Sequence, residues 1–341
     1  MSAQGTPAPR MAAVIPTFRR PASLLRALES LRHQTLEDFS VLVVDNAAQA
    51  EVAALVREFA ATAPMPVRYV AQPVPGLHSA RNLALRVAGA DVLAFTDDDA
   101  TFEPGWLAVH QRAFAADPGL GAAGGPVLPV FEAPPPDWLT RRLAGQREFP
   151  VLSLVQPLGA DIRGPEAPVY GVNMAVRREL AVALGGFHPE CFGAVWLGDG
   201  ETGLMRKLAG AGHGLAALAG AVVHHHIPPE RMTPVYFCRR MANQGAADVY
   251  TDFHRALPGR ARLLRHAGGL ALRHWRTWAR AWLLRGRTGP GELDTQMAAA
   301  ATLARLGYVL RLTWDARLRA LVRRDNWMDD DPAGPGGEAR P

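Results

Sequence analysis

A chain of 341 residues (36.7 kDa), 48% hydrophobic and with a formal net charge of +5, can form one large domain, or a domain with an appendage, around a sizeable core. No apolar run reaches the roughly 18 residues that cross a bilayer, no secretory signal opens the chain, and the two cysteines form neither a disulfide framework nor a zinc-binding spacing. The composition therefore predicts a cytoplasmic protein with reduced thiols.

Short apolar runs alternate with amphipathic segments through the first hundred residues. The apolar runs predict strands, and the segments with apolar residues at helical spacing predict helices. Strands are expected at 11–16, 39–44, 67–70 and 92–95, and helices from Pro21, at 51–61, from Ser79 and at 104–115. This alternation predicts an α/β fold with a mostly parallel sheet, in which ligands bind beyond the carboxyl ends of the strands.

Three consecutive carboxylates, Asp97, Asp98 and Asp99, follow the apolar run 92–95. In an extended segment alternate side chains share a face, so Asp97 and Asp99 are expected to point together and Asp98 away from them. Adjacent carboxylates repel each other unless a cation compensates, and Mg²⁺ or Mn²⁺ prefers oxygen ligands. The pattern equally allows a solvated acidic turn in which Asp99 or Thr101 caps the following helix.

Polar side chains also stand at the ends of the first two predicted strands. Thr17 comes directly after the first strand and Asp45 ends the second, while residues 97–99 follow the fourth. Because the carboxyl ends of parallel strands meet at one edge of a sheet, these positions are expected to lie close together. Their coincidence favours a binding site over an acidic turn.

The middle of the chain is less regular. Residues 126–168 are rich in proline at first and show weak periodicity, so we expect an irregular excursion over the site. Further elements are expected as a strand at 169–176, a helix opened by residues 198–202 and a last strand at 218–226, on which His224 and His226 share a face.

The C-terminal part is basic and has the pattern of helices. Residues 229–325 carry 18 arginines against seven acidic residues, with Trp275, Trp278 and Trp282 among them. These helices either pack on the preceding domain with a solvated basic face or make peripheral contact with an anionic membrane. No nucleic-acid-binding motif is present, so no nucleic-acid partner is expected. Residues 326–341, acidic and rich in Gly and Pro, are expected to be disordered.

Several segments, taken in order, resemble those of family 2 glycosyltransferases with the GT-A fold. They are VIPTFRR, VVDNA, GLHSARNLAL, FTDDDA, GVNMAVRR, GGF, GDGETGLMRKLAGAG and a histidine after the last strand. The resemblance covers roughly residues 11–230. We therefore expect a flexible N-terminus at 1–10, a GT-A domain at 11–228, a basic helical region at 229–325 and a disordered tail from 326 to the end.

The resemblance implies an inverting transfer of a sugar from a nucleotide-diphosphate sugar to a hydroxyl group of a glycan or a lipid-linked acceptor. Such a reaction belongs to the biosynthesis of glycans or polysaccharides. The resemblance also implies Mn²⁺ or Mg²⁺ as cofactor. The expected location is the cytoplasm, with the inner face of the membrane as the alternative if the basic helices touch lipid.

The resemblance assigns roles to residues at the matching positions. Asp45 is expected to hold the nucleotide base or ribose, and Thr17, His78 and Arg81 to line the nucleotide and its phosphates. Residues 97–99 correspond to the DXD element of the family. The expected metal ligands are Asp99, Asp97 and His224, with His226 as the alternative histidine. Asp97 or Asp98 is alternatively expected to serve the ribose or to support the metal.

Glu201 falls where the family has its catalytic base. The local order here is Asp-Gly-Glu, so Asp199 is the alternative base. Inversion in one step needs a carboxylate to take the acceptor's proton and a cation to hold the departing diphosphate. A helix start keeps a carboxylate ionised, which suits Glu201 as a base. The other interpretation of Glu201 is a first-turn acid that stabilises its helix.

The sequence gives less support to two competing functions. A sugar-nucleotide pyrophosphorylase normally has a glycine-rich N-terminal loop with a reactive lysine, and residues 11–20 contain neither. A non-catalytic relative that binds a carbohydrate or a protein partner would have no need of residues 97–99 together with Glu201. The sequence therefore favours a metal-dependent glycosyltransferase.

Overall fold

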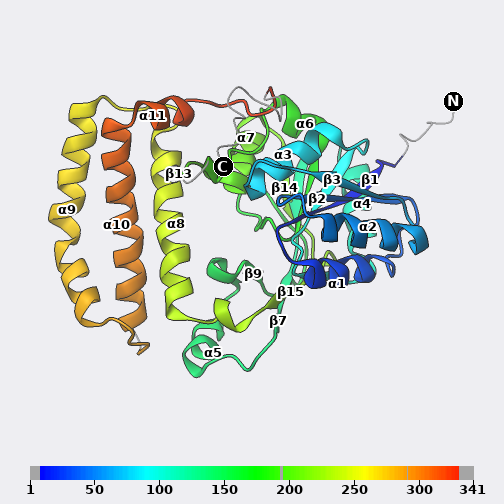
Figure 1. Cartoon of the computed structure of the whole chain (residues 1–341), viewed down its shortest axis with the longest axis horizontal. Helices are drawn as coiled ribbons and strands as arrows, with labels where there is room; N and C mark the ends of the chain where they lie inside the picture. The colour runs from blue at the N-terminus through cyan, green and yellow to red at the C-terminus, as the bar shows by residue number, and fades with distance from the viewer. Residues whose placement is uncertain (1–7, 193–194, 290, 330–341) are drawn as a thin grey trace.

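The computed structural model describes residues 8–192, 195–289 and 291–329. Its centre is an eight-stranded sheet (Figure 1). The strands lie in the order β10 (Ile162–Arg163), β14 (Gly214–Ala217), β6 (Leu120–Gly124), β11 (Met174–Arg177), β4 (Val92–Phe95), β1 (Met11–Thr17), β2 (Phe39–Asp45) and β3 (Val67–Ala71). The expected parallel pairing is found from β4 through β1 and β2 to β3, whereas β11 is antiparallel to both of its neighbours. The edge strand β10 is also antiparallel to β14, so the sheet is mixed: most strands run in one direction, and β11 and β10 run against them.

Helices cover both faces of this sheet. They are α1 (Pro21–Leu31), α2 (Ala50–Thr62), α3 (Leu77–Val87), α4 (Trp106–Ala116), α6 (Arg178–Ala183) and α7 (Gly200–Gly210). Alternate residues of β1 enter two separate cores: Ala13 and Ile15 pack with α1, α2 and α4, whereas Ala12 and Val14 pack with α3, α6 and α7. A strand buried on both faces reads as an unbroken apolar run, which explains why β1, β2 and β4 were visible in the sequence.

A second sheet contains five short strands. Their order is β5 (Ala100–Phe102), β15 (Val223–Ile227), β7 (Val127–Phe131), β9 (Leu154–Val155) and β8 (Glu148–Phe149), and α5 (Asp137–Leu143) and η1 (Pro150–Leu152) connect them. A separate hairpin joins β12 (Cys191–Phe192) to β13 (Val195–Trp196). The expectation of an irregular excursion at 126–168 was therefore wrong. Strands of two residues have no periodicity, so pattern alone does not detect them.

Two other boundaries also differ from expectation. The strand expected at 218–226 begins only at Val223, as β15. The preceding strand, β14, ends at Ala217, and a turn closes between them where the N–H of Ala221 donates to the carbonyl of Leu218 at 3.1 Å. Helix α3 begins at Leu77, after Gly76, rather than at Ser79.

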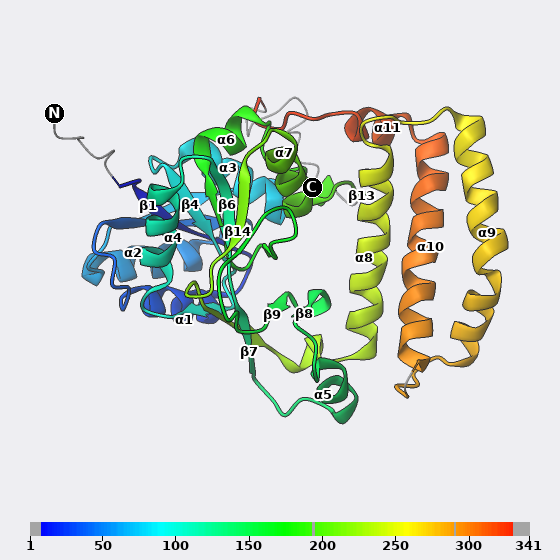
Figure 2. The same ribbon diagram turned by 180° about the vertical axis from the view of Figure 1, so that it is seen from behind.

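The C-terminal helices stand beside the α/β part. After η2 (Pro229–Arg231) they are α8 (Pro234–Phe253), α9 (Arg260–Leu283), α10 (Glu292–Trp314) and α11 (Ala316–Val322). Helix α8 lies next to the α/β part, α10 lies between α8 and α9, and α9 is outermost, as both views show (Figures 1 and 2). A third hydrophobic core joins these helices to Leu197, whose carbonyl accepts a hydrogen bond from Tyr308 Oη at 2.6 Å. The helices therefore contact the segment that leads into α7.

The segment after α11 is ordered where the structure describes it. Trp327 is only 3% exposed, and its backbone N–H donates to the carbonyl of Gly185 at 2.8 Å. The expectation of disorder from residue 326 onward was therefore wrong for 326–329, because the tryptophan buries a large apolar surface. Residues 1–7 and 330–341 lie outside the described part of the chain. Among the described helices, none is both long and apolar enough to cross a membrane.

Candidate functional site

A cleft of about 420 Å³ opens beyond the carboxyl ends of β1, β2 and β4. Its lining is Pro16, Thr17, Phe18, Arg20, Asn46, Pro75, Gly76, Leu77, Asp97, Asp98, Asp99 and Arg231. The fold therefore brings Thr17 and the three aspartates together, as the strand ends predicted. The cleft contains both carboxylates and guanidinium groups, so it suits a ligand that carries charge.

Asp98 and Asp99 are buried and share one arginine. Asp98 accepts hydrogen bonds from Thr17 Oγ1 at 2.7 Å and from Arg20 at 3.3 Å. Asp99 Oδ2 accepts from Arg20 at 2.9 Å and from Arg231 at 2.6 Å. The expectation that Asp98 points away from its neighbours was wrong, because β4 ends at Phe95 and the aspartates form a turn rather than an extended segment.

The pKa values of Asp98 and Asp99 are shifted in opposite directions. Burial raises the pKa of Asp98 to about 6, and the neighbouring Asp99 carboxylate adds to this rise. Burial acts in the same sense on Asp99, but His225, Arg231 and Arg20 hold the pKa of Asp99 below its usual range. Asp99 is therefore ionised at neutral pH and is the carboxylate best prepared to meet a cation.

The histidine beside the aspartates is His225, whereas His224 was expected. Side chains alternate along β15, so His225 points toward Asp99 and its Nε2 lies 3.4 Å from Asp99 Oδ1. His224 instead pairs with Glu103 at 2.7 Å, and His226 Nε2 lies 3.1 Å from Thr101 Oγ1. The fold therefore brings neither His224 nor His226 to the carboxylates.

The atoms around Asp99 fit a divalent cation. Asp99 Oδ1 is buried and has no hydrogen-bond partner among the described residues. The Nδ1–H of His225 donates to the carbonyl of Leu152 at 3.0 Å, so in the neutral ring the lone pair is on Nε2, beside Asp99. A carboxylate oxygen and an imidazole nitrogen are acceptable ligands for Mn²⁺. Arg231 donates to the same nitrogen at 2.8 Å and so supplies positive charge at this position.

Asp45 is buried and is not among the residues that line the cleft, so its expected contact with the nucleotide stays a prediction. The carboxylate accepts hydrogen bonds from the backbone of Ala47 at 2.8 Å and of Gln49 at 2.7 Å, and from Tyr69 Oη at 3.0 Å. These donors, in a fully buried position, make Asp45 the residue that shapes the turn between β2 and α2. The next residue, Asn46, lines the cleft in its place.

His78 lies between two glutamates. Its Nδ1 is 2.5 Å from Glu190 and its Nε2 is 2.7 Å from Glu201. Burial lowers the pKa of His78, but the charges and hydrogen bonds of the two glutamates outweigh burial and raise that pKa to about 9. At neutral pH His78 is therefore an imidazolium that donates to both carboxylates.

Arg81 connects Glu201 to the aspartates. Its guanidinium lies 3.5 Å from Glu201 and 3.4 Å from Asp97, and donates to the carbonyl of Gly171 at 2.9 Å. A Cβ at position 171 would lie 2.4 Å from the guanidinium, so only glycine admits Arg81 here. Burial would raise the pKa of Glu201, but His78 and Arg81 hold that pKa well below its usual range.

Asp199 points to a different place from Glu201. Its carboxylate accepts hydrogen bonds from His188 Nδ1 and Thr251 Oγ1, each at 2.8 Å, and neither Asp199 nor Glu201 is among the residues that line the cleft. Gly200 lies between the two acids with φ +51°, and a Cβ there would come within 2.2 Å of the His78 ring. The Asp-Gly-Glu order therefore separates a residue that faces α8 from one that faces His78.

Four residues of the site were not singled out from the sequence: Arg20, Glu190, His225 and Arg231. Arg20 belongs to the VIPTFRR segment, and His225 stands between the two histidines that were considered. Testing both faces of the last strand could have found His225, and examining the charged residues of the VIPTFRR segment could have found Arg20. Glu190 and Arg231 carry no motif, and only the fold brings them to the site.

Comparisons with known proteins identify the family and the fold. The family model described as "Glycosyl transferase family 2" matches residues 12–182. The succinoglycan biosynthesis protein ExoM of Rhizobium meliloti is 29% identical over 258 residues, which are 75% of this chain and 78% of ExoM. A glucosyl-dolichyl phosphate glucuronosyltransferase of Haloferax volcanii is 25% identical over 50% of this chain and 53% of its own. A mannosyltransferase of Pyrobaculum calidifontis, solved with GDP-Man and Mn²⁺, has a similar fold, with a TM-score of 0.53, 22% identity and coverage of 94% of this chain and 86% of its own.

The pKa of His78 generates a test of the site. Because the pKa of about 9 lies above the ordinary value of about 6.5, the stability that His78 contributes is fully present below pH 6.5 and is lost as the pH rises through 9. NMR titration of the histidine rings should show one ring titrating near pH 9, and Glu190→Gln should lower that value. Glu166→Gln, at an exposed position, should leave it unchanged. A His78 ring that is already neutral at pH 7 would contradict the arrangement.

Proposed function

Because the chain belongs to glycosyl transferase family 2 and is a glycosyltransferase that uses a nucleotide-sugar donor, we propose that the cleft binds the donor diphosphate and that Glu201 accepts the proton of the acceptor hydroxyl. The observation that carries this proposal is the position of Arg81, whose guanidinium contacts both Asp97 and Glu201. A single guanidinium group therefore bridges the proposed metal site and the proposed base. The reaction is an inverting transfer in one step.

Arg20 and Arg231 support the diphosphate assignment. Both guanidinium groups line the cleft and hold Asp99, so they can turn to phosphate oxygens when a cation takes their place at the carboxylate. Asp99 and His225 are the residues that would hold Mn²⁺ or Mg²⁺, and Asp97 and Asp98 would support it. When bound, such an ion stabilises the charge that develops on the departing diphosphate. Thr17 and Asn46 are placed to contact the rest of the nucleotide.

Glu201 is suited to proton transfer by its neighbours. The imidazolium of His78 orients the carboxylate, and the pKa shift keeps Glu201 ionised and able to accept a proton. Glu190 in turn holds His78 in place through two backbone N–H groups as well as the ring. His78 and Glu190 are thus positioning residues for the base. Asp199 takes no part in proton transfer, because its carboxylate is turned toward α8.

The acceptor class follows from the relatives. ExoM is named for succinoglycan biosynthesis, and other similar proteins are named chondroitin synthase and validoxylamine A glucosyltransferase. A growing glycan, free or lipid-linked, is the acceptor that these names support for this chain. Binding measurements with a panel of UDP, GDP and dTDP sugars would identify the donor sugar and its nucleotide.

The first test concerns the metal. Asp99→Asn removes the ionised carboxylate, so the affinity for a nucleoside diphosphate in the presence of Mn²⁺ should fall by roughly 100-fold, and excess chelator should have the same effect on the unaltered protein. Isothermal titration calorimetry with UDP, GDP and dTDP measures both. Asp91→Asn, at the opposite end of β4, is the matched control and should bind normally. Nucleotide affinity that persists unchanged in chelator would refute the metal assignment.

The second test concerns the base. Glu201→Gln should retain donor binding and lose about 10²–10⁴-fold in kcat, because the amide cannot accept the acceptor's proton. Asp199→Asn should reduce kcat far less, measured at a temperature at which both variants are folded. Steady-state kinetics with the identified donor give the ranking. A larger loss in Asp199→Asn than in Glu201→Gln would transfer the role of base to Asp199.

We further propose that α9 makes peripheral contact with an anionic lipid surface. The helix contains six arginines and no acidic residue. Its outer face exposes Leu272 and Leu283 together with Trp275 and Trp282, which are 55% and 67% exposed. Trp278, by contrast, is partly buried and donates to Thr302 at 2.8 Å, so it belongs to the contact with α10. Exposed tryptophan among arginines on the outermost helix matches the chemistry of an anionic interface.

Vesicle sedimentation tests this contact. The full chain should bind vesicles that contain phosphatidylglycerol at low salt, release them as salt rises, and ignore phosphatidylcholine, since each basic residue contributes about 1 kcal/mol within a Debye length. The double variant Trp275→Ser/Trp282→Ser should bind at least about tenfold more weakly. Val235→Ser, an exposed apolar residue of α8, should not. Equal binding to both kinds of vesicle, or to neither, would refute the proposal.

A further inference from the structure

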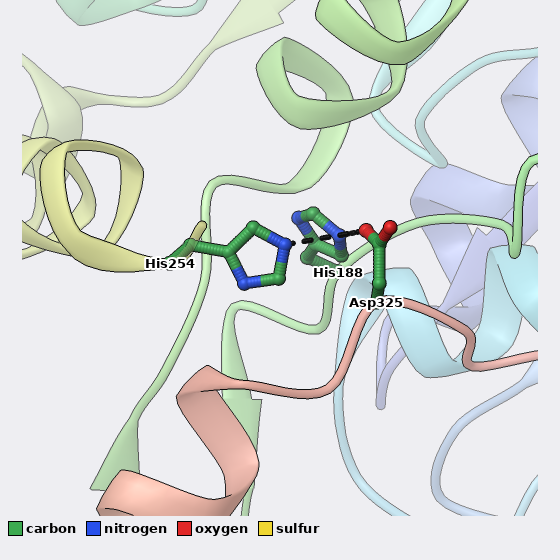
Figure 3. Close-up of side chains that lie close together, drawn as sticks. All are labelled: His188, His254 and Asp325. Carbon is green, nitrogen blue, oxygen red and sulfur yellow. Dashed lines mark hydrogen bonds and ion pairs between the residues drawn. The ribbon is translucent and has the colours of Figure 1, made fainter. Parts of the chain in front are cut away.

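A second polar cluster lies away from the donor cleft, between the α/β part and the C-terminal helices. It contains His188, from the segment before β12, His254, at the end of α8, and Asp325, in the segment after α11 (Figure 3). Each offers one ligand atom, and these atoms all lie within 4.8 Å of one another. A cavity of about 300 Å³ opens beside them. The reaction proposed above uses none of the three.

The Nδ1 atom of each histidine already takes part in a hydrogen bond. His188 Nδ1 bonds the carboxylate of Asp199 at 2.8 Å, and His254 Nδ1 bonds the carbonyl oxygen of Val322 at 2.5 Å. A carbonyl and an ionised carboxylate only accept hydrogen bonds, so both Nδ1 atoms carry hydrogen. In each neutral ring the lone pair is therefore on Nε2.

Both lone pairs are directed at the same carboxylate oxygen. Asp325 Oδ1 lies 3.3 Å from His188 Nε2 and 3.2 Å from His254 Nε2 (Figure 3). Three acceptors that converge on one point repel one another unless positive charge lies among them. Protonating both rings would place two imidazolium groups with centroids 4.6 Å apart beside Lys207, whose Nζ is 3.4 Å from Asp325 Oδ1.

We propose that His188, His254 and Asp325 bind a divalent transition-metal ion, Zn²⁺ by preference, as a structural clasp. Two imidazole nitrogens and a carboxylate are a zinc-type ligand set. The separations of 3.2 and 3.3 Å match the edge of about 3.3 Å of a tetrahedron whose ligands lie about 2.0–2.1 Å from zinc. Asp199 and the Val322 carbonyl are the outer partners that orient zinc-binding histidines in general.

The rest of the cluster agrees with this assignment. The ammonium of Lys207 donates to the carbonyls of Asp325 at 2.8 Å and of Gly186 at 3.2 Å, so it is held by neutral oxygens as well as by the carboxylate. The cavity beside the ligands leaves room for water at the fourth tetrahedral position. Asp325 is exposed, so an ion can reach the site from solvent.

The clasp joins three segments that are far apart in the sequence. His188 precedes α7, His254 ends α8, and Asp325 follows α11. Asp199, which orients His188, is the residue before α7, and that helix carries Glu201 in its first turn. Metal binding would therefore tie the C-terminal segment and α8 to the start of the helix that carries the proposed base. This inference does not depend on the proposed function, because its ligands lie outside the donor cleft.

The test is zinc binding by the full chain after removal of metal with chelator. Titration calorimetry and metal analysis should find one tightly bound Zn²⁺ per chain, both in the unaltered protein and in Asp99→Asn, which separates this site from the donor cleft. Zinc at a hundredfold excess over Kd should raise the midpoint of thermal unfolding by roughly 5 °C. Co²⁺ in its place should give the visible absorption of a tetrahedral site.

Substitutions of single residues measure how much each contributes to zinc binding. His188→Gln, His254→Gln and Asp325→Asn should each weaken zinc binding by more than about 100-fold and abolish the thermal shift, and Asp199→Asn should weaken it by about 10–100-fold. His33→Gln, at an exposed histidine, should bind as the unaltered protein does. Circular dichroism establishes that each variant is folded before titration. No zinc uptake by the unaltered protein, or uptake that survives any one of the three ligand substitutions, would overturn the proposal.

Discussion

The site depends on the compensation of three adjacent negative charges at the end of a buried strand. Asp97, Asp98 and Asp99 repel one another, and burial would neutralise them if no cation were near. Guanidinium groups from three distant parts of the chain supply the positive charge: the loop after β1, helix α3 and the segment after β15. The need for counter-charge therefore accounts for the arginines in the cleft. When a metal ion binds the carboxylates, the same arginines become available to a diphosphate.

A second consequence is that acids of similar appearance acquire different tasks from their surroundings. Glu201 and Asp199 are two positions apart, yet one faces an imidazolium and the other faces α8. The positive φ of Gly200 and its contact with the His78 ring allow this divergence. The C-terminal helices contribute through Tyr308 and Thr251, whose hydroxyl groups donate to the carbonyl of Leu197 and to Asp199 in the segment that leads into α7. They are thus part of what positions the proposed base, in addition to any contact that α9 makes with lipid.

Much of the fold could be predicted because the central strands are buried on both faces and therefore appear as continuous apolar runs. The meeting of Thr17 with the aspartates followed from the rule that parallel strands end at one edge. What failed was side-chain direction: the turn after β4 turned Asp98 inward, and the alternation along β15 selected His225. The role of Asp45 toward the nucleotide stays a prediction, and a motif could not show that its carboxylate also accepts hydrogen bonds from Tyr69 and from its own turn. Contacts such as Glu190 with His78 join residues 112 positions apart, which periodicity does not encode.

A crystal structure with Mn²⁺ and a nucleoside diphosphate tests the central claim most directly. The account predicts an anomalous peak for Mn²⁺ between Asp99 Oδ1 and His225 Nε2, with the diphosphate on the same ion and with Arg20 and Arg231 turned from Asp99 to phosphate oxygens. Glu201 should keep its contacts with His78 and Arg81 on the far side of the sugar position. A diphosphate bound elsewhere, or bound in the cleft with both arginines still on Asp99 and no manganese beside them, would contradict the account.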